Sequence, residues 1–524
     1  MTITRQGIVA TCQALASEEG VRILARGGSA VDAAIAANAV LAVTEPMMDG
    51  IGGDLFAMVW EAKTGKLTGL NSSGPAPRGL TPEFLGGRGI KEMPARGIHS
   101  VTVPGAVKGW EAMHKRYGKL PWKDLFQAAI AYAEQGFPVA EGMHEAWQTK
   151  YLKENRESAR VFLPGGEAPA TGQIFRNPDL GRALRLIAEK GPESFYKGEI
   201  AAAIVKTSRA LGGTMTAEDL AAFRPEWVQP VYTDYRGWRV YEMPPNDQGM
   251  AALEMLNIMG TVPAAGGGAA SVDEMHTRIE AMKLAYSDLY RYNADPDETK
   301  VPLRGIISED YGKRRAAQID PKKANCKVTA GTPVDGDTTY LTAVDRDGNV
   351  TSWIQSVSGT FGSAVTVEGM GILLQNRGGT GFTLEKKPNL LVGGKRPRHT
   401  IIPAFMEKGD LHIGFGIMGG PNQPLAHAQF VSNVVDYGMN VQAALEAPRF
   451  TKPTANGCDV TIESRVALST LQGLSERGHQ IRIAREYTQQ MGRGQAILHD
   501  SKTGVNYGAS DPRADGAATP EPIQ

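Results

Sequence analysis

The spacing of hydrophobic residues predicts helices in two parts of the chain. Residues 272–292 carry apolar side chains every three or four positions, which is the period of one helix face. That face consists of Met275, Ile279, Met282, Tyr286 and Leu289. Residues 13–26 also predict a helix, which Gly27 and Gly28 end, and Ser29 then caps a second, Ala-rich helix. Because the second helix is apolar on all sides, we expect it to be buried.

The strand-like segments are shorter and follow turn residues. Glycine-rich residues 50–54 lead into a strand at residues 55–60, and residues 235–242 predict another strand. Between them, residues 105–224 are mostly helical in pattern. Within that region, residues 216–219 (Thr-Ala-Glu-Asp) resemble a capping box at the start of a helix.

The pattern changes at a polar connector. Residues 321–337 are rich in Gly and Pro, which predicts an exposed linker. Residues 338–344 (TTYLTAV) follow directly and are the most strand-like of the chain, and residues 350–358 form a second β-rich run. The intervening Asp-Arg-Asp-Gly-Asn suits a type I turn with a left-handed Gly bulge. The two runs therefore predict a hairpin.

The loop length decides which side chains face each other across this hairpin. A three-residue loop pairs Asp345 with Asn349 and places Thr338 opposite Ser356, two hydroxyls on one face roughly 5 Å apart. A two-residue Asp-Gly loop instead places Ser356 on the other face. The D-x-D-G spacing favours the three-residue loop.

Composition indicates a globular protein without a charge bias. Hydrophobic residues make up 42% of the 524 residues, and 56 basic residues balance 56 acidic ones. This balance argues against a binder of nucleic acid or of anionic membranes. The longest apolar run, residues 30–43, contains Asp32 and Asn38, so we expect no membrane span. The N-terminus has no signal-like pattern, so we expect a cytoplasmic protein, or a periplasmic or secreted one if a leader was removed.

Cysteine and histidine spacing gives no metal or cofactor signal. Cys12, Cys326 and Cys458 are far apart in the sequence and form no CxxC pair. The pattern therefore supports neither a zinc ribbon nor a disulfide framework. No HExxH pair occurs among the nine histidines, and we expect neither a metal nor a cofactor.

A threonine at the start of a strand can serve as a nucleophile. Its hydroxyl is weak until a base takes the proton, and an N-terminal threonine carries that base as its own α-amine, with a pKa near ~8. A linker that feeds a strand beginning with Thr338 is what self-cleavage requires, and Ser356 would then orient the hydroxyl. On these residues alone, an ordinary hairpin that carries hydroxyls is the simpler interpretation.

The hairpin sequence GDTTYLTAVDRDGNVTSWIQSVSGTFGSAV resembles the processing region of the γ-glutamyltranspeptidases. Further segments agree in order along nearly the whole chain: GIVATCQALASEEGVRILARGGSAVDAAIAANAV, GIGGDLFAMVW, VTVPGAVKGW, EMPPNDQGMAALEMLNIM, GILLQNRGGTGF, GKRPRHTIIPAF, GFGIMGG, AALEAPRF and SDPRADG. The resemblance implies an α+β fold, the four-layer αββα sandwich of N-terminal-nucleophile hydrolases, assembled from two autoproteolytic fragments.

The resemblance also implies where the chain is cut. Cleavage between Asp337 and Thr338 gives a large subunit, residues 1–337, and a small catalytic subunit, residues 338–524. The large subunit then contains the helical portion at 105–224 and ends in the linker at 321–337. Thr338 is implied as the nucleophile and, through its freed amine, as the general base.

Gly419 and Gly420 match the glycine pair whose backbone N–H groups form the oxyanion hole of the family. Glycine allows close approach of the backbone to a substrate. Without the resemblance, this pair predicts a tight turn. Gly414, Gly416 and Gly419 also spell GxGxxG, a dinucleotide-binding pattern, but two prolines interrupt the following helix and the nearest acidic residue precedes a helix. No GxSxG serine-hydrolase motif occurs.

Several recognition positions depart from the family. Tyr340 replaces the usual His, and Ser356 replaces a Thr but keeps the hydroxyl. The Arg that grips the glutamyl α-carboxylate is missing, because Asn71 and its polar neighbours occupy its place. Arg377 and Thr380 correspond to the residues that receive the glutamyl ammonium.

The remaining departures complete the candidate pocket. His399-Thr400 stands in place of a serine pair, and the loop at residues 383–394 is shorter than the lid of many transpeptidases. The candidate substrate-binding residues are Asn71, Ser358, Arg377, His399 and Thr400. A cation at position 377 would repel an ammonium and could bind a carboxylate instead. The alternative is that Arg377 pairs with an internal acid such as Glu368 or Glu385.

These features favour a hydrolase of a small amide or acyl amide that works through an acyl-enzyme, similar to the acylase and amidohydrolase branch of the family. Its expected partners are a small-molecule amide and its own cleaved fragment. The first alternative is a true γ-glutamyl hydrolase or transpeptidase that acts on glutathione. The second is an uncleaved, non-catalytic binding protein.

Overall fold

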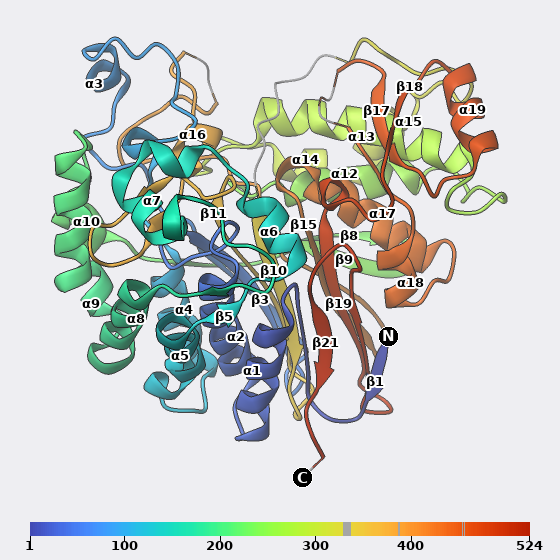
Figure 1. Cartoon of the computed structure of the whole chain (residues 1–524). Coiled ribbons are helices and arrows are strands. Elements are labelled where there is room, and N and C mark those ends of the chain that lie inside the picture. Colours follow the sequence, from blue (N-terminus) through green and yellow to red (C-terminus); the bar gives the residue numbers. More distant parts are fainter. Residues whose placement is uncertain (329–336, 386–387, 453, 455, 524) are drawn as a thin grey trace.

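Two seven-stranded sheets stack face to face, and helices cover both outer surfaces (Figure 1). The computed structural model describes residues 1–523 except 329–336, 386–387, 453 and 455. One hydrophobic core lies between the first sheet and its helices, and a second lies between the other sheet and its helices. The arrangement is the four-layer αββα sandwich expected for this sequence.

The first sheet carries the predicted hairpin at its centre. Its strand order is β21 (Ala517–Pro520), β2 (Ile8–Thr11), β10 (Asp337–Val344), β11 (Val350–Ser358), β3 (Asp54–Glu61), β4 (Lys66–Ser72) and β7 (Glu226–Val228). Every pair in this sheet is antiparallel. The helices on its outer surface are α1 (Ala14–Ala25), α2 (Ala30–Thr44), α4 (Ala106–Tyr117), α5 (Gln127–Gln135) and α8 (Pro178–Lys190).

The second sheet supplies the strand that precedes the glycine pair. Its order is β1 (Thr2–Thr4), β20 (Val505–Ser510), β19 (Arg493–Asp500), β15 (Leu411–Met418), β14 (Ala404–Lys408), β9 (Trp238–Glu242) and β8 (Val231–Tyr235). Its outer helices are α12 (Gly249–Met259), α13 (Val272–Tyr292), α17 (Gln423–Val435) and α18 (Val441–Glu446). Strands β10 and β15 face each other across the two sheets.

Shorter elements surround this sandwich. The further helices are α3 (Pro82–Gly86), α6 (Glu141–Trp147), α7 (Arg156–Phe162), α9 (Glu193–Tyr196), α10 (Glu199–Ala210), α11 (Ala217–Ala222), α14 (Leu303–Ile306), α15 (Glu309–Ala316), α16 (Arg377–Gly381) and α19 (Leu468–Glu476). The further strands are β5 (Phe137–Pro138), β6 (Ile174–Phe175), β12 (Val365–Thr366), β13 (Leu373–Leu374), β16 (Phe450–Thr451), β17 (Asp459–Glu463) and β18 (Gln480–Ala484).

The predicted helix boundaries are confirmed where capping residues define them. Ser29 and Asp32 form a capping box at the start of α2, and every residue of that helix is buried. Thr216 and Asp219 form the same motif at the start of α11. Helix α13 has the predicted bounds, and its predicted apolar face is buried.

The single strand predicted at residues 235–242 is wrong. The region contains the end of β8 and the whole of β9, joined by a tight turn at Arg236 and Gly237. Both turn residues have positive φ, +49° and +84°. The turn could not be predicted from the sequence, because a non-glycine residue such as Arg236 seldom adopts a positive φ.

The cysteine prediction is also wrong. Cys326 and Cys458 form a disulfide although 132 residues separate them. Spacing patterns report only cysteines that are close in sequence, whereas this pair meets because the start of the predicted linker lies against a small sheet of β16, β17 and β18. Cys12 is a free, buried thiol.

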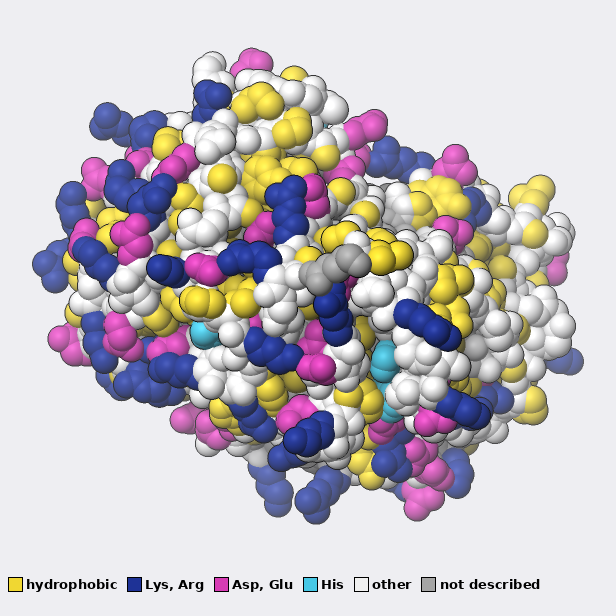
Figure 2. Space-filling model, turned by 90° about the horizontal axis from the view of Figure 1, so that it is seen from below, with side chains coloured by type: hydrophobic (Ala, Val, Ile, Leu, Met, Phe, Trp, Pro, Cys, Tyr) yellow, Lys and Arg dark blue, Asp and Glu magenta, His cyan; other side chains and the backbone are white. Residues whose placement is uncertain are grey.

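The surface in Figure 2 has basic and acidic side chains interspersed. This distribution matches the equal numbers of the two charge types in the sequence. Within the part of the chain that the structure describes, no helix has both the length and the apolar composition to cross a membrane.

Candidate active site

The start of β10 brings two hydroxyls together at the centre of the molecule. Asp345 pairs with Asn349 at the hairpin loop, so the three-residue loop is confirmed and the two-residue alternative is excluded. Thr338 Oγ1 lies 3.5 Å from Ser356 Oγ, and both side chains are fully buried. The pairing shifts between Asp337 and Thr339, so the strand is irregular at the position where Thr338 stands.

A residue that sequence analysis missed also contacts the Thr338 hydroxyl. Gln423, the first residue of α17, donates from Nε2 to Thr338 Oγ1 at 3.3 Å. Its Oε1 accepts the Ile402 backbone N–H at 3.0 Å, which fixes the orientation of the amide. Arg493 donates to the Thr338 carbonyl oxygen at 3.4 Å. The nucleophile candidate is therefore contacted from both sheets.

The glycine pair lies directly after β15, on the same side of the molecule as Gln423. Gly419 and Gly420 have φ of +146° and +55°, conformations that favour glycine. A Cβ on Gly419 would meet the Gly492 Cα at 3.2 Å. The Gly420 carbonyl accepts from Gln248 Nε2 at 2.9 Å, which anchors the turn.

The other glycines of the GxGxxG pattern have a packing role. A Cβ on Gly414 would lie 2.6 Å from Thr342 Oγ1, and one on Gly416 would lie 2.4 Å from the ring of Tyr340. These glycines therefore let the two sheets approach each other. Tyr340, which stands where the family has His, is buried, and its hydroxyl lies 2.9 Å from Ser352 Oγ.

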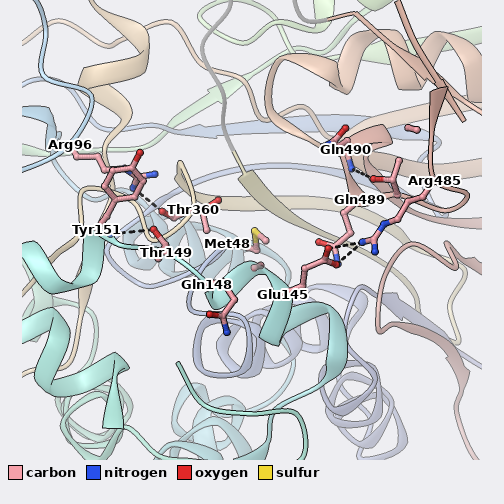
Figure 3. A pocket seen from close by; sticks show the side chains of 13 residues that line it. Met48, Arg96, Glu145, Gln148, Thr149, Tyr151, Thr360, Arg485, Gln489 and Gln490 are labelled. Atoms are coloured by element: carbon pink, nitrogen blue, oxygen red, sulfur yellow. Dashed lines mark hydrogen bonds and ion pairs between the residues drawn. The ribbon is translucent and has the colours of Figure 1, made fainter. Parts of the chain in front are cut away.

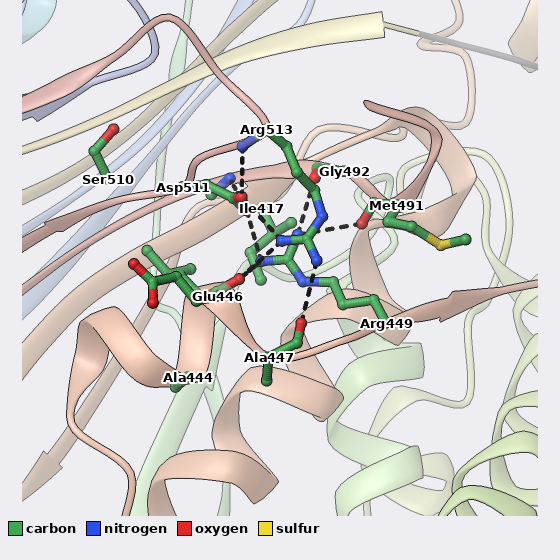
Figure 4. Close-up of polar contacts among 12 residues, drawn as sticks. Ile417, Ala444, Glu446, Ala447, Arg449, Met491, Gly492, Ser510, Asp511 and Arg513 are labelled. Atoms are coloured by element: carbon green, nitrogen blue, oxygen red, sulfur yellow. Dashed lines mark hydrogen bonds and ion pairs between the residues drawn. The ribbon is translucent and has the colours of Figure 1, made fainter. Parts of the chain in front are cut away.

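The C-terminal SDPRADG segment contacts Arg449 beside Gly492, as Figure 4 shows. Arg449 donates to the carbonyl of Gly492 at 2.9 Å, and Gly492 lies against Gly419. Asp511 accepts from Arg449 Nη2 at 2.6 Å and from Arg513 Nη1 at 2.9 Å. Because these charges are buried and paired with one another, their removal would disturb the turn that they support.

Arg377 is buried with half of its guanidinium unpaired. Nη1 donates to Thr400 Oγ1 at 2.7 Å, whereas Nε and Nη2 have no hydrogen-bond partner among the described residues. Neither acid that we considered as a partner contacts it, since Glu368 pairs with Lys206 and Glu385 is exposed. Burial lowers the pKa of Arg377 to about 10, so it remains charged at neutral pH.

Asp54 and His399 lie beside Arg377. The sequence predicted His399 as a site residue but not Asp54. His399 donates from Nε2 to Asp54 Oδ2 at 3.0 Å, and its Nδ1 accepts the Ile401 N–H at 3.4 Å, which defines the neutral tautomer. Burial, together with Arg377, lowers the pKa of His399 well below its usual value. Burial raises the pKa of Asp54 to about 7. We therefore treat the contact as a hydrogen bond from neutral His399 and not as an ion pair.

The last two candidate residues have different surroundings. Asn71 is buried and engaged by the protein, because its Nδ2 donates to Asn246 Oδ1 at 2.9 Å and its Oδ1 accepts from Ser73. Ser358 has a positive φ of +83°, and its N–H donates to Ser356 Oγ at 2.8 Å. Its own hydroxyl lies 3.1 Å from Thr380 Oγ1. Ser358 thus links the nucleophile region to the Arg377 helix.

An open cavity of about 570 Å³ lies next to strand β11. Met48 lines it, and the Met48 carbonyl accepts the N–H of Val357, the neighbour of Ser356. Figure 3 shows Glu145 and Arg485 paired at its rim, with Arg485 Nη2 2.7 Å from each carboxylate oxygen. Neither Thr338 nor Arg377 lines this cavity, so it lies beside the candidate site and does not contain it.

One histidine cluster elsewhere has metal-like spacing. The ligand atoms of His276, Glu280 and His479 all lie within 4.8 Å of one another. However, Lys283 Nζ lies 2.5 Å from Glu280 Oε1, and His276 Nδ1 lies 2.8 Å from His479 Nε2. An ammonium against the carboxylate opposes a divalent cation, so we assign no metal to this cluster.

Comparison with known proteins extends the similarity over the whole chain. Residues 16–521 match the γ-glutamyltranspeptidase family. The chain belongs to the γ-glutamyltranspeptidase family. It is 38% identical to the glutathione hydrolase-like YwrD proenzyme of Bacillus subtilis, over 96% of each chain, and 32% identical to the oxamate amidohydrolase proenzyme of Klebsiella pneumoniae, over 98% of each. The crystal structure of the cephalosporin acylase from Bacillus halodurans superimposes with a TM-score of 0.92 at 42% identity, covering 99% of this chain and 96% of that one.

Family membership confirms the predicted fold and reaction class. This γ-glutamyltranspeptidase-family chain is an N-terminal-nucleophile hydrolase that processes itself and cleaves amide bonds. Sequence analysis missed Gln423 and Asp54, which reach the site from distant segments. The only early signal for Gln423 was its place four residues after Gly419.

Proposed function

We propose that the chain cuts itself between Asp337 and Thr338 and that the freed Thr338 then hydrolyses amides of acyl groups that end in a carboxylate. Residues 1–337 would form the large subunit and residues 338–524 the small one. The observation that carries the substrate class is the buried, half-unpaired guanidinium of Arg377.

The contacts of Thr338 support its role as nucleophile. In the uncut chain, its hydroxyl would attack the carbonyl carbon of Asp337, and water would hydrolyse the resulting ester to leave a free α-amine on Thr338. That amine then takes the proton of Oγ1 as Oγ1 attacks the substrate carbonyl. The N–H groups of Gly419 and Gly420 would stabilise the oxyanion. The amine product leaves with a proton, and water releases the acid from the acyl-enzyme.

Gln423 is proposed to position the nucleophile. Its Nε2 donates to Thr338 Oγ1. The Ile402 N–H donates to its Oε1 and so prevents a 180° flip of the side-chain amide. The hydroxyl of Thr338 must then direct its own proton elsewhere, toward Ser356 in the uncut chain and toward the freed amine after cleavage. Gln423 thus supports the proton transfer that activates the hydroxyl.

Arg377 supports recognition of a carboxylate. Nε and Nη2 lie on one side of the guanidinium and present two parallel N–H groups, the geometry of a bidentate carboxylate contact. Buried donors without partners are costly, so a ligand that pairs with both gains binding energy. Arg398 adds a second positive charge nearby, and His399 is neutral. Asp54 is an acid that lies beside Arg377, but burial raises its pKa to about 7, so the two arginines outweigh it and would repel an α-ammonium placed here.

Matched substrates test this function. Glutaryl, γ-glutamyl and valeryl anilides share a five-carbon acyl chain and differ only in the carboxylate and the α-ammonium. We expect kcat/KM to be highest for the glutaryl compound. A higher kcat/KM for the γ-glutamyl compound would exclude the proposed pocket. Equal values for glutaryl and valeryl compounds would show that no carboxylate is recognised.

A γ-glutamyl hydrolase that acts on glutathione is the second candidate. Its support is that several similar proteins are named glutathione hydrolase proenzymes, including one from Escherichia coli at 34% identity. The same three anilides decide between the two functions. Family membership argues against the other alternative, an uncleaved binding protein, which would give a single full-length band on a reducing denaturing gel.

A further inference from the structure

One covalent bond crosses the proposed cleavage site. The disulfide joins Cys326 and Cys458, whose Cα atoms lie 4.9 Å apart. Cys326 precedes Thr338 by 12 residues (338 − 326), and Cys458 follows it in the chain. A cut between Asp337 and Thr338 therefore leaves one cysteine of the bonded pair on each fragment.

The chain around Cys326 is held on the small fragment by further contacts. The Gly457 N–H donates to the Cys326 carbonyl at 3.2 Å, and the Ala324 N–H donates to the Arg477 carbonyl at 2.7 Å. Helix α13 of the large fragment holds the same segment, because Lys283 Nζ donates to the Asn325 carbonyl at 2.8 Å. The disulfide thus lies in an ordered junction between the two fragments.

The His276–His479 contact belongs to the same junction. His276 lies on α13 and His479 lies in the small fragment, and their ring nitrogens are 2.8 Å apart. The second ring nitrogen of His276 lies 2.8 Å from the Asp320 carbonyl oxygen. Residues 320–326, which include the start of the predicted linker, therefore contact both fragments, whereas residues 329–336 of that linker lie outside the described residues.

We infer that this disulfide survives maturation and makes the mature enzyme a single cross-linked molecule of two fragments. The inference rests on the proposed cleavage before Thr338. Peptide hydrolysis adds one water across the Asp337–Thr338 bond and leaves the sulfur–sulfur bond unchanged. Hydrogen bonds hold the fragments together elsewhere, and the disulfide is the covalent part of that attachment.

The redox state of the surroundings controls this link. Two thiols lose two protons and two electrons to an oxidant when the bond forms, and a dithiol reverses the reaction. Cys326 is exposed, so a soluble reductant reaches the bond, whereas Cys458 is buried. Stable disulfides are typical of oxidising compartments. In a reducing cytoplasm the two fragments would be held by non-covalent contacts alone.

A denaturing gel, run with and without reductant, tests the disulfide link between the fragments. Purified protein is treated with diamide, an azo oxidant that is reduced to a hydrazine as the two thiols join. Without reductant we expect one species with the mass of the full chain plus one water. With dithiothreitol we expect two species, of 337 and 187 residues (524 − 337). Thiol titration in denaturant should find one free cysteine before reduction and three after it.

Cysteine variants provide matched controls for the gel. Cys326→Ser and Cys458→Ser should each give two bands without reductant, whereas Cys12→Ser should remain linked. Two separate fragments from diamide-treated wild-type protein would overturn the inference. A single band that persists after reduction would instead contradict the cleavage on which the inference rests. In that case a titration of one thiol rising to three would still show that the disulfide exists, so the two failures are distinguishable.

Discussion

The regions around Thr338 and Arg377 are built in opposite ways. Protein groups surround the Thr338 hydroxyl, with Ser356 on the paired strand and Gln423 on the facing layer. Arg377 is equally buried, but two of its nitrogens find no acceptor among the described residues. A completed hydrogen-bond network fixes a reacting group in place, whereas buried donors without partners mark where a ligand belongs. We therefore assign the reaction chemistry to the region around Thr338 and substrate specificity to the region around Arg377.

Loss of the Thr338 hydroxyl should have the largest effect. We expect Thr338→Ala to stay full length and to show no measurable turnover, because the proposed mechanism uses this one oxygen for both cleavage and catalysis. A reducing gel and an anilide assay measure the two outcomes. Thr338→Ser is the matched control and should be cleaved and active. If Thr338→Ala is cut normally, another residue starts the reaction.

Changing Arg377 should affect specificity and leave the chemistry intact. We expect Arg377→Gln to lower kcat/KM for the glutaryl anilide by about 10- to 100-fold, since a charge-assisted pair contributes roughly 1.5–3 kcal/mol. Cleavage into fragments and kcat/KM for the valeryl anilide should change little. Arg377→Lys keeps the charge but not the planar fork, so it should restore only part of the loss. An equal loss on both substrates would mean that Arg377 is structural.

Replacing Gln423 should slow turnover more than it weakens binding. We expect Gln423→Leu to lower kcat several-fold with little change in KM, because about 1 kcal/mol of hydrogen bonding to the nucleophile is lost. Gln423→Glu has the same shape but donates only when protonated, so its activity should increase toward acidic pH relative to that of the wild type. Identical pH profiles for the two proteins would exclude the donor role.

Ser356→Ala should have the smallest effect. The contact between Ser356 and Thr338 is long, and its loss should cost about 1 kcal/mol or less, a several-fold lower rate. Processing should slow in the same direction, and thermal unfolding should show that the fold is kept. Normal cleavage and a normal kcat would mean that Ser356 does not orient the nucleophile.

Local sequence signals predicted the hairpin correctly, but they did not predict contacts between residues that are far apart in the sequence. The Asp345–Asn349 loop fixes the register over a few residues, so turn chemistry alone placed Ser356 opposite Thr338. Gln423 reaches Thr338 across 85 residues of sequence, and no periodicity reports such a contact. The charge of Arg377 was visible in the sequence, but its two unpaired nitrogens depend on how the surrounding layers pack.

The two cysteines and the 235–242 region illustrate the same limit. Cys326 and Cys458 carry no mutual spacing signal, because tertiary packing alone brings them together. The turn between β8 and β9 was missed because Arg236 takes a conformation that its residue type rarely adopts. Family resemblance supplied the layers and the reaction class, which local patterns alone did not determine.

N-terminal sequencing of the small fragment tests the central claim most directly. Purified protein is separated on a reducing gel, and the smaller band is subjected to Edman degradation. The account predicts that the first residues are Thr-Thr-Tyr-Leu, beginning at Thr338. A different first residue, or a single band of 524 residues, would contradict it.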